Sequence, residues 1–424
     1  MEPLLPNCTE LEKDSMRFFA ARTGVKDIVS IEGSVHGGWY LLPTELHLSP
    51  RIAAGLMDAD TKRQDKETLR NALAARGASL SFSVGADRTY FHASCLPEDI
   101  RFICELITEC LSEATFRKPE IDNERTRVLS ELDESKTQTN EQASQAFTRL
   151  VFDPNHVNYA DPLEQDIKRV KESTQSHLRT YQKMLGKGGL VFAITGDIVP
   201  EKALRDADRA FSKLPAGTHE LAPKTRNTKK AEPLKKLITI PDKANIDTFI
   251  GVPVALTRDH ELYLPFLILT NMLGSGGLFM GHLMRTIRER DGLTYGIRAS
   301  AYGFSEGGDG ALRIWATFSP QTFDHAVAMT KKEIGNFFAK GITSDALRME
   351  QDHSVGGYAL GLSTSRGLAS MLHKIGREGK ALSYIDEFPN LIRGITIDDL
   401  KSVASLILLD KLSLAAAGTF SEKN

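Results

Sequence analysis

Cysteine is scarce in this sequence, which has four cysteines among 424 residues. No two of them have Cys-x-x-Cys spacing, so the patterns of a cysteine-ligated zinc site and of a disulfide framework are both missing. Cys104 and Cys110 fall on the apolar side of a predicted helix, and buried free thiols fit a reducing compartment. We therefore expect a cytoplasmic protein.

The sequence also lacks an export signal pattern and a membrane-spanning run. Residues 1–14 contain Pro3, Pro6 and several acids but no basic-then-apolar segment, so a periplasmic location is expected only if a signal peptide was removed before residue 1. No apolar run approaches the roughly 20 residues needed to span a bilayer. The net charge of −2 gives no basis for nucleic acid or an anionic membrane as the main partner.

What is present is a chain too long for one hydrophobic core, so two or more domains are expected. Segment 215–236 is rich in Lys, Pro, Thr and Ala and has almost no large apolar residues. Such a composition is typical of a linker. We predict an N-terminal domain at 1–214, a linker at 215–236 and a C-terminal domain at 237–424.

The second domain repeats the first. Gly77 lies between a predicted helix and a predicted strand, as Gly292 does in the second half. An apolar strand ending at Gly196 likewise matches one ending at Gly418. The two separations, 215 and 222 residues, are nearly equal, which predicts two copies of one domain.

Each copy mixes helices with hairpin-like strands. In the first half, apolar alternation and glycine punctuation predict strands at 27–33, 79–84, 89–95 and 190–195. Helical periodicity predicts helices at 49–57, 66–76, 119–135, 142–152, 167–184 and 201–214, with another after Pro97. This mixture predicts an α+β fold in which helices cover one face of a largely antiparallel sheet.

The most distinctive stretch is 273–304, which opens with Gly274, Gly276 and Gly277. These glycines suit a loop with unusual backbone angles or a close approach to another chain. A phosphate cradle is one alternative, although the loop lacks the Gly-Lys-Ser/Thr ending of a P-loop and the full dinucleotide fingerprint. A packing loop before a core helix is another.

A helix-to-strand turn follows the glycines. The spacing of Leu283 and Ile287 predicts a helix that ends at Gly292, and a strand rich in β-favouring residues comes next. Arg288 and Tyr295 lie on either side of this turn, so we expect the guanidinium and the phenol to point at the same spot. The plain alternative for Arg288 is a surface ion pair.

The pattern Gly-Gly-x-x-x-Gly-x-Leu-x-x-x-x-Arg-Glu-x-x-Gly-Leu-x-Tyr, which ends at Tyr295, resembles the second-half signature of the insulinase, pitrilysin and mitochondrial processing peptidase superfamily of zinc peptidases. The resemblance covers nearly the whole chain, from about residue 27 to residue 418. It implies two like domains that face each other as half of a clam-shell chamber. It also implies that Arg288 and Tyr295 complete a zinc active site borne elsewhere.

The chain departs from the superfamily where the zinc should be bound by His-x-x-Glu-His and a distal Glu. Counting back from 60–63 places Arg51, Ala54 and Gly55 at the positions of His, Glu and His, and none of them can ligate zinc. No two of the eleven histidines lie four residues apart. Glu131, which follows Gly55 by 76 positions, matches the distal ligand, but its alternative is a solvated or ion-paired helix residue.

Three hypotheses remain. The first is a non-catalytic subunit of a heterodimeric zinc metallopeptidase, with no cofactor of its own and with zinc in a homologous partner. This subunit would close the chamber, supply Arg288 and Tyr295 in trans, and bind peptide through a strand edge and the residues Gly274, Ser275, Gly276 and Gly277. The second is a structural or assembly subunit without a peptidase role. The third is an independent metallopeptidase with unrecognised ligands.

Overall fold

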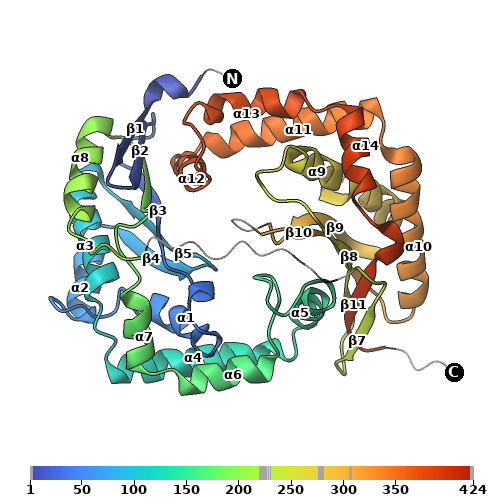
Figure 1. Ribbon diagram of the computed structural model, residues 1–424, viewed down its shortest axis with the longest axis horizontal. Helices are drawn as coiled ribbons and strands as arrows, with labels where there is room; N and C mark the ends of the chain where they lie inside the picture. Colours follow the sequence, from blue (N-terminus) through green and yellow to red (C-terminus); the bar gives the residue numbers. More distant parts are fainter. Residues whose placement is uncertain are drawn as a thin grey trace. The chain divides into compact units, whose positions relative to one another are not determined.

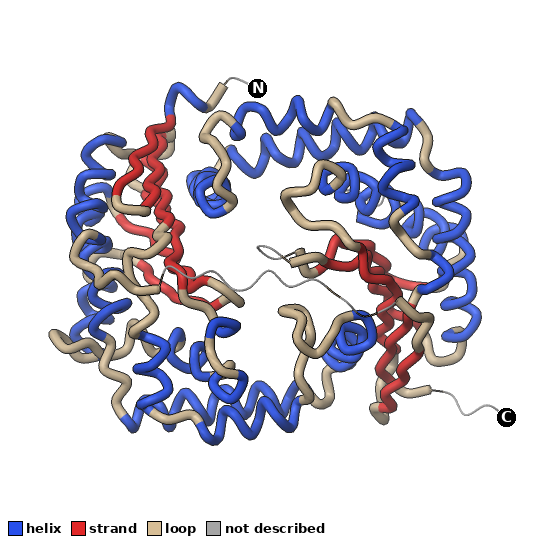
Figure 2. Tube along the Cα trace, in the orientation of Figure 1, coloured by secondary structure: helices blue, strands red, loops and turns tan. Residues whose placement is uncertain are grey.

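The computed structural model describes residues 3–218, 227, 229, 231–275, 281–304 and 308–420. The chain forms two compact units, each built on one sheet (Figures 1 and 2). Unit 1 consists of Met1–Ser130, Leu163–Ala222 and Tyr358–Phe388, and unit 2 of Glu131–Pro162, Pro223–Gly357 and Pro389–Asn424. No helix in the described ranges is long and apolar enough to cross a membrane.

The sheet of unit 1 has six strands in the order β1-β2-β6-β3-β5-β4. All neighbours are antiparallel except β2 and β6, which are parallel. The strands are β1 (Cys8–Lys13), β2 (Met16–Arg22), β3 (Val29–His36), β4 (Ser79–Val84), β5 (Arg88–Cys95) and β6 (Val191–Gly196).

The sheet of unit 2 has five strands in the order β7-β11-β8-β10-β9. Its neighbours are antiparallel except β7 and β11, which are parallel. The strands are β7 (Lys235–Thr239), β8 (Ile246–Val254), β9 (Thr294–Tyr302), β10 (Gly310–Phe318) and β11 (Ser413–Gly418).

The two sheets repeat one topology. Without β1, the order in unit 1 matches that of unit 2 strand for strand, and the parallel pair occupies the same place. Gly196 and Gly418 close equivalent strands at φ 145° and 153°. A Cβ on Gly196 would lie 2.1 Å from the carbonyl oxygen of Ile28, and one on Gly418 would lie 2.8 Å from that of Asn245. These close approaches require glycine, and the predicted duplication is confirmed.

The N-terminal half of the chain contributes eight α-helices within its described residues. They are α1 (Ser49–Ala54), α2 (Lys66–Ala74), α3 (Ile100–Glu113), α4 (Lys118–Ser135), α5 (Thr139–Val151), α6 (Leu163–Glu172), α7 (Gln175–Gln182) and α8 (Pro200–Phe211). Helices α3 and α8 pack against each other, and α8 packs on β2. The rings of Phe18, Phe192 and Phe211 form the core between α8 and the sheet.

The C-terminal half contributes six α-helices within its described residues. They are α9 (Tyr263–Thr270), α10 (Phe323–Asn336), α11 (Ser344–Leu362), α12 (Ser365–Arg377), α13 (Tyr384–Arg393) and α14 (Ile397–Ser405). Two π-helical segments, η5 (Asn271–Ser275) and η6 (Met284–Arg290), precede β9. Helix α9 packs on β9, and α10 packs on η6.

The two halves of the chain exchange one helix each. Helix α12 packs on β2, β3 and β6 of unit 1, and α5 packs on β8 and β11 of unit 2 (Figure 1). Phe19, which points away from Phe18 because successive strand residues alternate, packs against α12. The central strands of unit 1 are therefore covered on both faces, and each unit is completed by a helix from the other half of the chain.

Most of the elements predicted for the first half of the chain are confirmed within a few residues. The predicted helix at 167–184 is two helices, because the Thr174 side chain accepts a hydrogen bond from the His177 amide and caps a new helix. Strands β1 and β2 were not predicted. The mostly antiparallel α+β class in two like domains is confirmed, and the boundary at 215–236 stays a prediction. The central strands of unit 1 differ from the expected helix cover on one face, because α8 packs on one side of them and α12 on the other.

Candidate functional site

Helix α1 carries the positions where the superfamily holds zinc. Arg51 is exposed, Ala54 is buried, and Gly55 follows as the cap residue at φ −68°. These positions present a guanidinium, a methyl group and no side chain. None of these groups can bind zinc.

A carboxylate occupies the space beside Gly55. A Cβ on Gly55 would lie 2.2 Å from Oε1 of Glu124, which projects from α4 in unit 1 and is only 8% exposed. Arg127 Nε donates to Glu124 Oε2 at 2.8 Å, and this ion pair offsets the burial of the charge. Burial raises the pKa of the nearby Asp58 carboxyl, and the charge of Glu124 adds to that effect.

These residues do not fit a zinc ion. In the described part of the chain, no group of three or more His, Cys, Asp or Glu side chains could hold a metal. Glu131 is exposed on α4, seven positions after Glu124, so the two carboxylates share one side of the helix. Sequence reasoning identified Glu131 and missed Glu124, although this seven-residue spacing is the signal that could have found it.

The glycine-rich stretch of unit 2 begins against the edge strand. A Cβ on Gly274 would lie 2.7 Å from the backbone nitrogen of Ala299 in β9, and one on Gly281 would lie 2.9 Å from the Cα of Gly274. Ser275 is the last residue of η5. The other two predicted peptide-binding positions, Gly276 and Gly277, lie outside the described residues. Glycine at 274 is explained by its close approach to β9.

Arg288 lies on η6, a π-helical segment of the kind often found at functional sites. The side chain is half-buried, and Nη1 donates to the Met284 sulfur at 3.8 Å. The segment ends at Arg290, and Gly292 in the turn that follows has a φ of 64°, the left-handed conformation that glycine adopts most easily. Leu293 donates its amide to the Ile287 carbonyl at 2.9 Å and closes the turn.

Tyr295 lies just beyond this turn on β9, the edge strand of the unit 2 sheet. Its side chain is 87% exposed, so the phenol is available to another molecule. The described structure thus places Arg288 and Tyr295 in the same unit, on consecutive elements. Their convergence on one spot stays a prediction.

A charged network fixes the end of η6. Arg290 binds Asp291 through two hydrogen bonds of 2.7 and 2.8 Å and reaches Glu333 of α10 at 3.2 Å. These bonds raise the pKa of the Arg290 guanidinium. His282 also contacts Glu333, with Nε2 and Oε2 3.0 Å apart, yet burial lowers the pKa of its imidazole. Glu333 therefore connects α10 to Arg290 at the end of η6 and to His282, which precedes η6.

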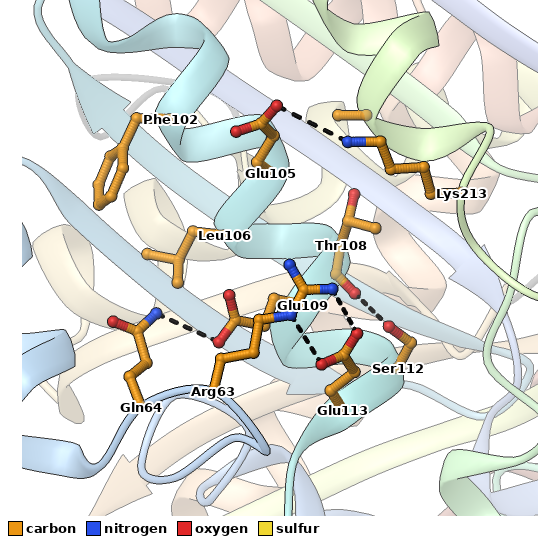
Figure 3. A pocket seen from close by; sticks show the side chains of 11 residues that line it. Arg63, Gln64, Phe102, Glu105, Leu106, Thr108, Glu109, Ser112, Glu113 and Lys213 are labelled. Carbon is orange, nitrogen blue, oxygen red and sulfur yellow. Dashed lines mark hydrogen bonds and ion pairs between the residues drawn. The ribbon is translucent and has the colours of Figure 1, made fainter.

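A separate cavity of about 240 Å³ lies in unit 1 between α3, α8 and the loop before α2 (Figure 3). Three glutamates of α3, Glu105, Glu109 and Glu113, lie along the helix at four-residue spacing. Arg63 binds Glu113 through bonds of 2.6 and 2.9 Å, Gln64 donates to Glu109 at 3.2 Å, and Lys213 lies 3.7 Å from Glu105. Each carboxylate is thus already paired with a side chain from a neighbouring segment. Because these pairs occupy the carboxylate oxygens, we do not assign the cavity as a cation site.

Comparison with known families gives two matches along the chain. The sequence model for "Insulinase (Peptidase family M16)" matches residues 55–160, and that for "Peptidase M16 inactive domain" matches residues 173–352. Together they cover more than half of the sequence.

Individual relatives agree with these matches. An uncharacterized zinc protease of Streptomyces coelicolor is 23% identical over 87% of this chain and 80% of its own length. The beta subunit of the mitochondrial-processing peptidase of Saccharomyces cerevisiae is 24% identical over 37% of this chain and 33% of its own length.

Solved structures share the fold. A peptidase M16 inactive-domain protein from Pseudomonas fluorescens has a TM-score of 0.87 at 16% identity and covers 99% of both chains. A periplasmic protease of Escherichia coli has a TM-score of 0.78 at 14% identity, with 99% of this chain and 46% of that chain covered. With its duplicated α+β architecture and its two matched domain types, the chain belongs to the insulinase family of peptidases, family M16.

Proposed function

We propose that this chain is the non-catalytic subunit of a two-chain zinc metallopeptidase. The observation that carries the proposal is the replacement of the zinc-ligand positions. Gly55 offers no side chain, and Glu124, held by Arg127, fills the space next to it. In this proposal a homologous partner subunit would hold the zinc, which would supply an activated water as the nucleophile.

In this proposal Arg288 and Tyr295 act in trans on the partner's substrate. Attack on a peptide carbonyl places negative charge on its oxygen, and a guanidinium and a phenol are the two donors that stabilise such a charge. One donor of this kind contributes about 3 kcal/mol to the transition state. The 87% exposure of Tyr295 supports the assignment, because a donor that serves another chain must be accessible.

Peptide binding falls to the glycine-rich stretch and the edge strand β9. An edge strand offers unpaired backbone donors and acceptors to an extended peptide. Gly274, the first residue of this stretch, lies against Ala299 of that strand. We assign Gly274, Ser275, Gly276 and Gly277 to binding the peptide backbone.

The proposal also includes a partner chain and a cellular compartment. One relative of this chain is named as a subunit, which supports a partner chain. Free cysteines at positions 8, 95, 104 and 110 support a cytoplasmic location, with the periplasm as the alternative if an export signal is removed.

Reconstitution tests the proposal. This chain and a family member with an intact His-x-x-Glu-His, taken from the same organism, are purified separately, and hydrolysis of an unfolded peptide is measured for each alone and for the mixture. We expect activity only in the mixture. A mixture no more active than the zinc-bearing chain alone would refute the proposal, and co-purification without any gain in activity would favour the assembly-subunit alternative.

A further inference from the structure

Unit 2 holds an arginine that is stacked on aromatic rings and, among the residues that the structure describes, is not paired with an acid. The guanidinium of Arg313 lies 3.7 Å from the ring centroid of Tyr302 and 5.1 Å from that of Phe249. Nη1 donates to Ser144 Oγ at 3.3 Å, while the buried Nε has no hydrogen-bond partner. Five donors on a rigid fork therefore make one long hydrogen bond within the described chain.

A second arginine lies beside it. Arg313 pairs with Ser300 across β10 and β9, and Trp315 pairs with Arg298. Because alternate residues of a strand share a face, Arg298 and Arg313 are diagonal neighbours on one side of the sheet. Arg298 is exposed on the edge strand.

The charge around this pair is one-sided. Burial lowers the pKa of Arg313 and the neighbouring charge of Arg298 lowers it further, while among the described residues the Tyr302 phenol opposes this shift. No carboxylate in the described ranges forms an ion pair with either arginine. The nearby Asp247 carboxylate accepts from Trp315 Nε1 at 2.7 Å and, within the described chain, forms an ion pair with neither arginine. Two neighbouring cations without an ion-paired carboxylate create a local positive field, which favours a bound anion.

The duplicated fold supplies an internal comparison. Equivalent registers in unit 1 place Tyr90 at the position of Arg313 and Ser81 at the position of Arg298. The same sheet therefore forms without either arginine. The pair is a feature of unit 2 alone and not a requirement of the architecture.

We propose that Arg313 and Arg298 form a carboxylate-binding site that selects peptides with an acidic side chain or a free C-terminus beside β9. A guanidinium takes a carboxylate through two parallel hydrogen bonds, and the stacking on Tyr302 holds the fork in place. An extended peptide paired with the β9 edge would carry that carboxylate alongside Arg298. The inference rests on the proposed peptide-binding function and names the class of peptide that is bound.

The test uses the full chain without its partner and calorimetric titration of four synthetic peptides. The peptides share one sequence with either Glu or Gln at a central position, and each has either a free or an amidated C-terminus. We expect the peptide with the recognised carboxylate to bind about tenfold more tightly than its neutral counterpart. The four peptides distinguish a side-chain carboxylate from a terminal one.

Variants localise the effect. Arg298→Gln and Arg313→Gln should each abolish the preference, and Arg298→Lys should keep part of it because the charge remains. Arg348→Gln, an exposed arginine on α11 paired with Asp345, is the matched control and should leave the preference unchanged. Melting curves show whether Arg313→Gln folds, and Arg298→Gln, at an exposed position, keeps the test decisive if it does not.

Two results would overturn the inference, and they are distinguishable. Equal binding of all four peptides, or a preference that survives in both glutamine variants, would remove the carboxylate site and leave the peptide-binding function intact. If none of the peptides bound, the proposed peptide-binding function would fail and the site would fail with it.

Discussion

Replacement of His373 by Gln should change how the stability of unit 1 depends on pH. His373 lies on α12, is 8% exposed, and its Nε2 lies 2.8 Å from Ser34 Oγ. In unit 2, Gly251 occupies the position equivalent to Ser34, and Phe147 takes the place of His373. The Phe147 ring lies 2.9 Å from where a Cβ on Gly251 would be, so this contact has no polar side chain. The fold thus does not need an imidazole here, and His373→Gln keeps a hydrogen-bonding group that cannot titrate.

The lowered pKa of His373 determines how the free energy of unfolding changes with pH. Burial holds the pKa of His373 well below 6.5, and the charges of Arg377 and Arg88 lower it further. Above about pH 6.5 the imidazole is neutral in both states and contributes nothing. As the pH falls below that value, the unfolded chain takes up a proton that the folded chain refuses. The free energy of unfolding then falls by up to about 1.4 kcal/mol per pH unit until the folded pKa is reached.

Urea denaturation at about pH 7.5 and about pH 5.5 measures the difference. Wild-type protein should lose about 1.4 kcal/mol more than His373→Gln between these conditions. The matched control is His325→Gln, which removes an exposed imidazole and should behave as wild type. If His373→Gln and wild type lost stability equally, the claim that His373 is buried as a neutral imidazole would be refuted.

Three further predictions concern the core, the linker and the metal. Asp309→Ala should lower the free energy of unfolding by about 3 kcal/mol, because the carboxylate accepts hydrogen bonds from His156 at 2.9 Å and from the Asn227 amide at 3.1 Å. A loss below about 1 kcal/mol in denaturant titration would contradict this prediction. Limited proteolysis should cut first within 215–236, and the fragments should elute together on a sizing column because α5 and α12 each pack on the other half's sheet; a first cut elsewhere, or separate fragments, would argue against it. Elemental analysis of the purified chain should find no stoichiometric zinc, and about one tightly held zinc per chain would refute the degenerate site.

The duplication was predictable from sequence because its markers are local. Gly196 and Gly418 end strands at positive φ, and Gly77 and Gly292 end helices at φ 57° and 64°. Only glycine takes these conformations easily, so the same residue recurs at the same point of each copy. The strands that follow these turns were predicted within about a residue for the same reason.

The exchange of α5 and α12 could not be predicted, because the hydrophobic period of a helix shows that one face is buried but not which sheet buries it. Strand β1 alternates apolar residues with acids only weakly, and β2 is a buried apolar run flanked by arginines that shows no alternation at all, so neither has the period-2 pattern of a strand with one exposed face. Sequence patterns likewise predicted only part of the candidate sites. Arg288 and Tyr295 were found from a motif, whereas Glu124 and Arg313 gain their meaning from neighbours that only tertiary structure supplies.

The central claim is that Arg288 and Tyr295 serve a partner's active site. Steady-state kinetics of the reconstituted pair test it most directly, with Arg288→Ala, Tyr295→Phe and the control Arg285→Ala, which removes an exposed arginine of the same segment. We expect Arg288→Ala to lower kcat about a hundredfold and Tyr295→Phe somewhat less, with little change in KM and with the complex intact, because both groups meet charge that appears only in the transition state. Arg285→Ala should leave kcat unchanged. Unchanged kcat in both test variants would contradict the catalytic role.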